Sequence, residues 1–234
     1  MSKLSIIIPA YNEARTIRRL VEKILATPFP TDFEVIIVDD HSKDRTYRIA
    51  KLLNERDLSK RIRLFRNDTN RGKGYSLQHG FQKVTGDIVV VQDADFEYDP
   101  AEIPGLMRPI LEGRVDVVYG SRFLGALRPQ GMALANCVAN HFLTILTNVL
   151  YGARLTDMET CYKLIRADIL RQLPLSAKRF DFEPEITSKL LKRKIRIHEL
   201  PISYHGRTAS EGKKIKARDF FIAVWVLLAN RFSP

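Results

Sequence analysis

Cysteine is scarce in this sequence, with two copies among 234 residues, Cys137 and Cys161. A disulfide framework or a cysteine-rich zinc site needs more, and a reducing compartment fits the chain best. The five histidines include no His-x-x-x-His pair, so a helical zinc signature is missing as well. The sequence therefore predicts neither a disulfide-stabilised scaffold nor a zinc enzyme.

Apolar runs long enough to cross a bilayer are also missing. A spanning helix needs about 20 predominantly apolar residues, whereas the last apolar segment, 220–229, has ten. Residues 132–151 are interrupted at helical spacing by a polar stripe of Asn136, Asn140, Thr144, Thr147, Asn148 and Tyr151. Both segments are predicted to pack on the core or to lie in a membrane interface. The apolar start of the chain, residues 4–8, is a predicted strand and not a signal peptide.

Glycine-rich phosphate loops do not follow the predicted strands. The segment 9–13, Pro-Ala-Tyr-Asn-Glu, has no glycine, which argues against a dinucleotide dehydrogenase and against a sugar nucleotidyltransferase. Residues 71–74, Arg-Gly-Lys-Gly, lack the Walker A spacing. Their two cations and permissive backbone at the start of a predicted helix still make Lys73 a candidate contact for an anion or a nucleotide.

Charge is unevenly distributed along the chain. Lysine and arginine number 38 against 27 acidic residues, for a net charge of +11, and residues 166–218 hold 14 of the basic and six of the acidic residues. A basic segment predicts an anionic partner, which can be a phosphate-rich substrate, anionic lipid or nucleic acid. No RNA-binding aromatic signature or recognition helix supports a nucleic-acid-binding module, so nucleic acid is not expected as a partner.

Short runs rich in valine and isoleucine alternate with helical patterns over the first 120 residues. Strands are predicted at 4–8, 35–38, 62–65, 88–91 and 115–119. Helices are predicted at 14–25, 45–56, 74–84 and 101–111, with Asn12 placed to cap the first, and Ser42 or Asp44 the second. Near-continuous apolar strands separated by helices indicate an α/β fold with a parallel sheet.

Carboxylates follow three of these strands, where open parallel sheets bind their ligands, and the first of them is Glu13 after the strand at 4–8. Asp93 and Asp95 lie two residues apart on extended chain, so they point the same way and suit Mg²⁺ or Mn²⁺. Asp39 and Asp40 follow the second strand. Only one of the two can cap the next helix, which leaves the other to accept a hydrogen bond from a base imino group or a ribose hydroxyl.

The motifs together resemble family 2 glycosyltransferases of the GT-A fold. The resemblance rests on Ile-Ile-Ile-Pro-Ala-Tyr-Asn-Glu at 6–13, Val-Asp-Asp-x-Ser-x-Asp-x-Thr at 38–46, Asn-x-Gly-Lys-Gly at 70–74 and Gln-Asp-Ala-Asp-Phe-Glu-Tyr-Asp-Pro at 92–100. Looser matches follow at 120–123, 156–163, 182–185 and 207–213. Within the family, the dolichol-phosphate mannosyltransferases and their bacterial polyprenyl-phosphate relatives are the most similar branch.

The resemblance implies a role for individual residues. Pro9, Tyr11 and Glu13 border the nucleotide, Asp39 binds its base, and Asp93 and Asp95 hold the metal, with Asp95 also counted as catalytic. Arg122 and Arg128 face the acceptor phosphate, and Arg207 and Lys213 clamp phosphates of the donor or product. The family spaces its second acceptor arginine differently, and Ser210 and Gly212 stand where the family has glycine and serine.

The implied activity is metal-dependent, inverting transfer of a hexose from a GDP- or UDP-sugar to a polyprenyl phosphate. A lipid phosphate is already anionic and needs cations but no general base. The alternative acceptor is a saccharide hydroxyl in surface polysaccharide synthesis, which requires a base, for which Asp157 is the first candidate and Glu159 the second. Pairing of Asp157 with a nearby arginine or lysine is the structural alternative.

A single GT-A domain is expected over 1–234, a mostly parallel sheet flanked by helices. It divides into a nucleotide-sugar half at 1–97, an acceptor half at 98–206, and a basic loop with a terminal amphipathic helix at 207–234. Segments 132–151 and 217–232 are expected to face the cytoplasmic side of the membrane, as peripheral contacts. The donor base, the hexose and the oligomeric state are left open.

Overall fold

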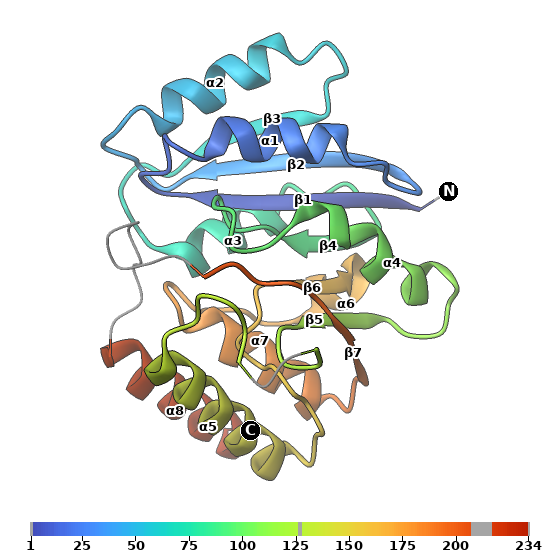
Figure 1. The fold of residues 1–234 in the computed structure, drawn as a ribbon, viewed down its shortest axis with the longest axis vertical. Helices are drawn as coiled ribbons and strands as arrows, with labels where there is room; N and C mark the ends of the chain where they lie inside the picture. Colours follow the sequence, from blue (N-terminus) through green and yellow to red (C-terminus); the bar gives the residue numbers. More distant parts are fainter. Residues whose placement is uncertain (1, 126–127, 207–216, 234) are drawn as a thin grey trace.

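The computed structural model describes residues 2–125, 128–206 and 217–233. One seven-stranded sheet has the order β3-β2-β1-β4-β6-β5-β7 and is flanked by helices (Figure 1). Its strands are β1 Lys3–Ala10, β2 Asp32–Asp39, β3 Ile62–Arg66, β4 Ile88–Val91, β5 Val117–Ser121, β6 Lys163–Arg166 and β7 Ile197–Pro201. The helices are α1 Ile17–Ala26, α2 Thr46–Arg56, α3 Lys73–Phe81, α4 Ile103–Leu111, α5 Leu134–Tyr151, α6 Ala167–Gln172, α7 Phe182–Lys192 and α8 Ala217–Phe232, with a short 3₁₀ helix at Pro100–Glu102.

The first four strands are parallel, as their apolar runs predict. β1 pairs with β2 on one side and with β4 on the other, and β2 pairs with β3. β6, which the sequence pattern did not reveal, is antiparallel to both β4 and β5. The sheet is therefore mostly parallel, and the carboxyl ends of β1, β2 and β4 lie together at one edge.

The cap predicted for the first helix is wrong. α1 begins at Ile17 without a side-chain cap, and Asn12 has a positive φ of 54°. The Oδ1 atom of Asn12 accepts from the Lys43 N–H at 2.8 Å, so this side chain joins the loops after β1 and β2. The cap predicted for the second helix is wrong as well, because the N-cap of α2 is Arg45, without a side-chain cap hydrogen bond. Asp44 lies one residue earlier, and its Oδ1 atom accepts from the Thr46 N–H at 2.9 Å.

Helix α5 is amphipathic, but its polar stripe faces inward. Thr144 and Thr147 are buried, and Thr144 Oγ1 accepts from the Met158 N–H at 3.1 Å. The outward face of α5 is apolar, with side chains 50–76% exposed at Leu134, Val138, Phe142, Ile145 and Val149. The prediction of an amphipathic helix is thus confirmed, and its apolar side is the exposed one.

Helices α5 and α8 lie side by side at the end of the molecule away from α2 (Figure 1). They share a small core of their own with Met158. α8 adds Phe221, Trp225 and Phe232 to the exposed apolar side chains. No helix among the described residues is long and apolar enough to span a membrane.

Candidate active site

Asp39 ends strand β2 with its side chain fully buried. Its Oδ2 atom accepts from Arg66 Nε at 3.1 Å and from the Ser42 N–H at 3.2 Å. Its Oδ1 atom has no hydrogen-bond partner among the described residues. A buried acceptor without a donor is costly, and an incoming N–H group at the sheet edge would satisfy it.

Asp40 has a different task, although it is the next residue. Its carboxylate accepts four hydrogen bonds of 2.7–2.9 Å from the loop between β3 and α3. The donors are the side chains of Asn67 and Asn70 and the backbone N–H groups of Arg71 and Gly72. Asp40 therefore fixes this loop, and Asp39 stays the candidate of the pair for a ligand.

The loop after β1 joins the same edge. Pro9, Tyr11 and Glu13 are all partly exposed there. The Glu13 N–H donates to Thr46 Oγ1 at 2.7 Å, and Thr16 Oγ1 donates to the Ala94 carbonyl at 2.6 Å. Hydrogen bonds thus tie the segment expected to border the nucleotide to α2 and to the turn between Asp93 and Asp95.

Asp93 and Asp95 follow β4, as predicted. Asp95 is buried and accepts from the Glu97 N–H at 3.0 Å, while Asp93 is partly exposed. No cluster of three or more metal-ligating side chains forms in the ranges that the structure describes. Two carboxylates still fit Mg²⁺ or Mn²⁺, because such ions commonly take one or two carboxylates and complete their shell with substrate phosphate and water.

Lys73 was expected to be an open contact for an anion, but its ammonium lies between two carboxylates of the protein. Its Nζ atom lies 2.8 Å from Asp93 Oδ1 and 2.9 Å from Glu183 Oε1. The N–H groups of Gly74 and Tyr75 donate to the carbonyls of Arg179 and Lys178, both at 3.1 Å. The N-terminus of α3 is therefore closed by protein carbonyls. The contact of Lys73 with the nucleotide-sugar donor stays a prediction.

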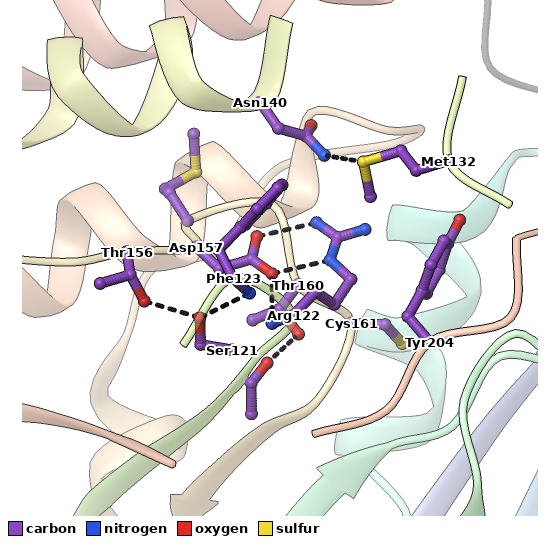
Figure 2. A network of polar contacts seen from close by, with 12 residues as sticks. Ser121, Arg122, Phe123, Met132, Asn140, Thr156, Asp157, Thr160, Cys161 and Tyr204 are labelled. Carbon is purple, nitrogen blue, oxygen red and sulfur yellow. Dashed lines mark hydrogen bonds and ion pairs between the residues drawn. The ribbon is translucent and has the colours of Figure 1, made fainter. Parts of the chain in front are cut away.

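Arg122 and Asp157 form a buried ion pair (Figure 2). Asp157 Oδ2 accepts from Arg122 Nε at 2.7 Å and from its backbone N–H at 3.0 Å, and Asp157 Oδ1 accepts from Nη2 at 2.8 Å. The guanidinium carbon lies 5.3–5.9 Å from the ring centres of Tyr98, Phe123 and Tyr204. Burial alone would lower the pKa of Arg122, but Asp157 raises it well above its usual range. Asp157 therefore orients Arg122. This pairing is the structural role that the sequence offered for Asp157 as the alternative to a general base.

Three other basic residues were expected at the site. One of them is exposed, and two fall outside the described residues. Arg128 is exposed, and its Nε donates to the Met132 carbonyl at 3.0 Å near the start of α5. Arg207 and Lys213 fall outside the described ranges.

Two residues that sequence reasoning missed hold the loop that carries Asp157. Glu199 on β7 accepts from the Thr156 N–H at 2.7 Å and from the Asp157 N–H at 3.0 Å. Lys163 on β6 is buried and donates to the carbonyls of Met158, at 2.9 Å, and Thr160. A charged residue inside an apolar strand pattern was the available signal for both, since such a charge must find a partner.

Glu159 lies on the same loop, between these anchors. Its Oε1 atom is buried and has no hydrogen-bond partner among the described residues. Burial first, and Glu183 second, raise the pKa of Glu159 to about 7. Glu159 remains a candidate base, as the sequence suggested.

Comparison with solved structures supports the fold. The glucosyl-3-phosphoglycerate synthase of Mycobacterium tuberculosis, crystallised with Mn²⁺, UDP and phosphoglyceric acid, superposes with a TM-score of 0.75, at 20% identity, over 100% of this chain and 80% of that one. The mannosyl-3-phosphoglycerate synthase of Rubrobacter xylanophilus gives a TM-score of 0.75 at 19% identity, over 97% of this chain and 73% of that one. Both likenesses concern the GT-A architecture alone.

Sequence comparison is more specific. A UDP-N-acetylglucosamine–dolichyl-phosphate N-acetylglucosaminyltransferase of Methanococcus voltae is 32% identical over 84% of this chain and 83% of its own length. A low-salt glycan biosynthesis hexosyltransferase of Haloferax volcanii is 30% identical over 87% of this chain, and a dodecaprenyl-phosphate galacturonate synthase of Rhizobium johnstonii is 27% identical over 96%. The chain spans 48% and 65% of those two relatives.

The family model described as "Glycosyl transferase family 2" matches residues 5–173. The match takes in the carboxyl edge of β1, β2 and β4 as well as the Arg122–Asp157 pair. Since it covers well over half of the chain and agrees with the sheet order, this protein belongs to glycosyltransferase family 2.

Proposed function

We propose that this chain transfers a hexose from a nucleoside-diphosphate sugar to a polyprenyl phosphate, with inversion at the sugar and with Mg²⁺ or Mn²⁺ on the donor. The observation that carries the donor half is the buried Oδ1 atom of Asp39, which has no hydrogen-bond partner in the described part of the chain and lies at the edge where Asp93 and Asp95 also lie. A base imino group would satisfy Asp39, and Asp93 and Asp95 would hold the metal. The metal would offset the charge that develops on the leaving diphosphate.

The acceptor half is supported by the names of two relatives. Those of Methanococcus voltae and Rhizobium johnstonii, the two that are named for a lipid phosphate among the relatives described above, carry dolichyl phosphate and dodecaprenyl phosphate in their names. A phosphate nucleophile is anionic at neutral pH, so this reaction needs a positioned cation and no base. Arg122, fixed by Asp157 and surrounded by aromatic rings, is the cation we assign to it, with the exposed Arg128 as a second contact.

Peripheral membrane contact, on the cytoplasmic face, is part of the proposal. The outward faces of α5 and α8 expose eight large apolar side chains, and α5 has no charged residue. Arg154 follows α5, and Arg218 and Arg231 stand near the two ends of α8. An apolar face bordered by arginines suits a bilayer with anionic headgroups, which would bring a lipid-linked acceptor to the enzyme.

A radiolabelled transfer assay tests this activity. Purified protein is incubated with polyprenyl phosphate, Mg²⁺ or Mn²⁺ and each common UDP- and GDP-sugar, with Asp95→Ala and EDTA as controls. We expect label in the organic phase from one donor, lost in both controls. Slow metal-dependent hydrolysis of one donor without lipid labelling would instead favour a saccharide acceptor. Label in the organic phase in the presence of EDTA would contradict the metal dependence.

A further inference from the structure

The ammonium of Lys73 joins three parts of the chain that are far apart in sequence. Lys73 is the first residue of α3, Asp93 follows β4, and Glu183 belongs to α7. The three side chains are only 7–24% exposed, and Lys73 lies within 2.9 Å of both carboxylates. Neighbours this close in a poorly hydrated site strongly influence one another's charge.

The backbone around Lys73 fixes this position. Gly72 has a φ of 97°, and a Cβ atom on Gly72 or Gly74 would come within 2.5 Å of the carbonyl oxygens of Lys178 or Ala177. The two glycines therefore let α3 dock against residues 177–179, just before the helix that carries Glu183. This docking explains why glycines flank Lys73 on both sides.

We infer that Lys73 and Glu183 are positioning residues that set the metal affinity of the Asp93–Asp95 pair. Lys73 neutralises part of the negative charge of Asp93 and occupies one side of its carboxylate. Glu183 shares the ammonium, so it limits how strongly Lys73 competes with a cation for Asp93. The inference rests on the proposed metal-dependent function and assigns Glu183 to the donor side of the site.

The two residues should act in opposite directions. In Glu183→Gln, Lys73 keeps Asp93 as its close ionised partner and loses Glu183, so Mn²⁺ should bind more weakly. In Lys73→Met, the competing cation is gone, and Mn²⁺ should bind more tightly. Changes to residues that support metal ligands typically alter metal affinity by about 10–100-fold, and we expect about tenfold in each direction.

The affinity for Mn²⁺ is measured without a turnover assay, by electron paramagnetic resonance of the free ion. Mn²⁺ is titrated with the whole protein, alone and with UDP or GDP. Lys189→Gln is the matched control, because Lys189 also lies on α7 and pairs with a buried glutamate, Glu185, at 2.6 Å. Misfolding would weaken binding in every variant, so a tighter Lys73→Met cannot arise from it.

The outcomes separate the two proposals. Suppose that the wild type binds Mn²⁺ and that the affinity of both variants is unchanged, or is weakened equally. This result overturns the positioning role and leaves the proposed activity standing. A wild-type protein that binds no Mn²⁺, alone or with either nucleotide, overturns the inference together with the metal-dependent function.

Discussion

At the scale of one residue, Asp39 is the group that we propose for binding the base of the nucleotide. Two protein donors hold its Oδ2 atom, and its buried Oδ1 atom has none among the described residues. We expect Asp39→Asn to weaken UDP or GDP binding by about 1–3 kcal/mol, because an amide offers one acceptor fewer. Isothermal titration calorimetry with each nucleotide measures the loss and identifies the preferred base.

Asp32 is the matched control, because it starts the same strand and is largely exposed at the opposite edge of the sheet. Asp32→Asn should bind nucleotide as the wild type does. Equal losses in the two variants would show that Asp39 acts on the strand and not on the ligand.

Asp157 distinguishes the two acceptor chemistries. Breaking its buried pair with Arg122 should cost about 3–5 kcal/mol of unfolding free energy in Asp157→Ala, and less in Asp157→Asn, which keeps one acceptor. If Asp157 only orients Arg122, Asp157→Asn should lower kcat and keep the shape of the pH–rate profile. Loss of the acidic limb of that profile, with stability retained, would make Asp157 a base and favour a hydroxyl acceptor.

At the scale of elements, the docking of α3 against residues 177–179 depends on the absence of a side chain. A Cβ atom at Gly74 would lie 2.5 Å from a backbone carbonyl, which cannot move as freely as a side chain. Gly74→Ala should therefore destabilise the protein by about 1–3 kcal/mol, measured by urea unfolding.

Gly105 in α4 provides the contrast, since a Cβ atom there meets nothing within 4 Å. Gly105→Ala should stabilise the protein by about 0.5–1 kcal/mol, because alanine is the better helix former. Destabilisation by both substitutions would contradict the contact-based explanation.

At the scale of the whole molecule, the apolar face of α5 and α8 predicts binding to anionic vesicles. Cosedimentation should fall with added salt, as screening weakens the attraction of a chain with a net charge of +11. Ile145→Glu, in the middle of the face, should reduce partitioning at least tenfold, because burying an isoleucine is worth about 1.5–3 kcal/mol.

Leu58 serves as the control, because it is 97% exposed and follows α2 in the chain. Helix α2 lies at the end of the molecule away from α5 and α8 (Figure 1). Leu58→Glu should partition as the wild type does. If Ile145→Glu binds vesicles equally well, another surface is responsible, and the assignment of the α5–α8 face to the membrane is wrong.

Local patterns predicted much of this molecule. The strands from β1 to β5 could be found because apolar runs are short-range signals, and the carboxylates after β2 and β4 converge because parallel strands end at one edge. β6 escaped prediction because its four residues include a buried lysine, Lys163. The first helix cap was also missed, since Asn12 bonds to a loop 31 residues away.

The sequence by itself determined the α/β class and the family, and it predicts which residues hold a nucleotide and a metal, because these depend on residue types and on spacing along the chain. Only the tertiary structure decided that the polar stripe of α5 faces inward, that Lys73 lies between Asp93 and Glu183, and that Asp157 forms an ion pair with Arg122. Each of these depends on partners tens of residues apart in the chain, and periodicity says that a helix has two faces but not which one the fold covers.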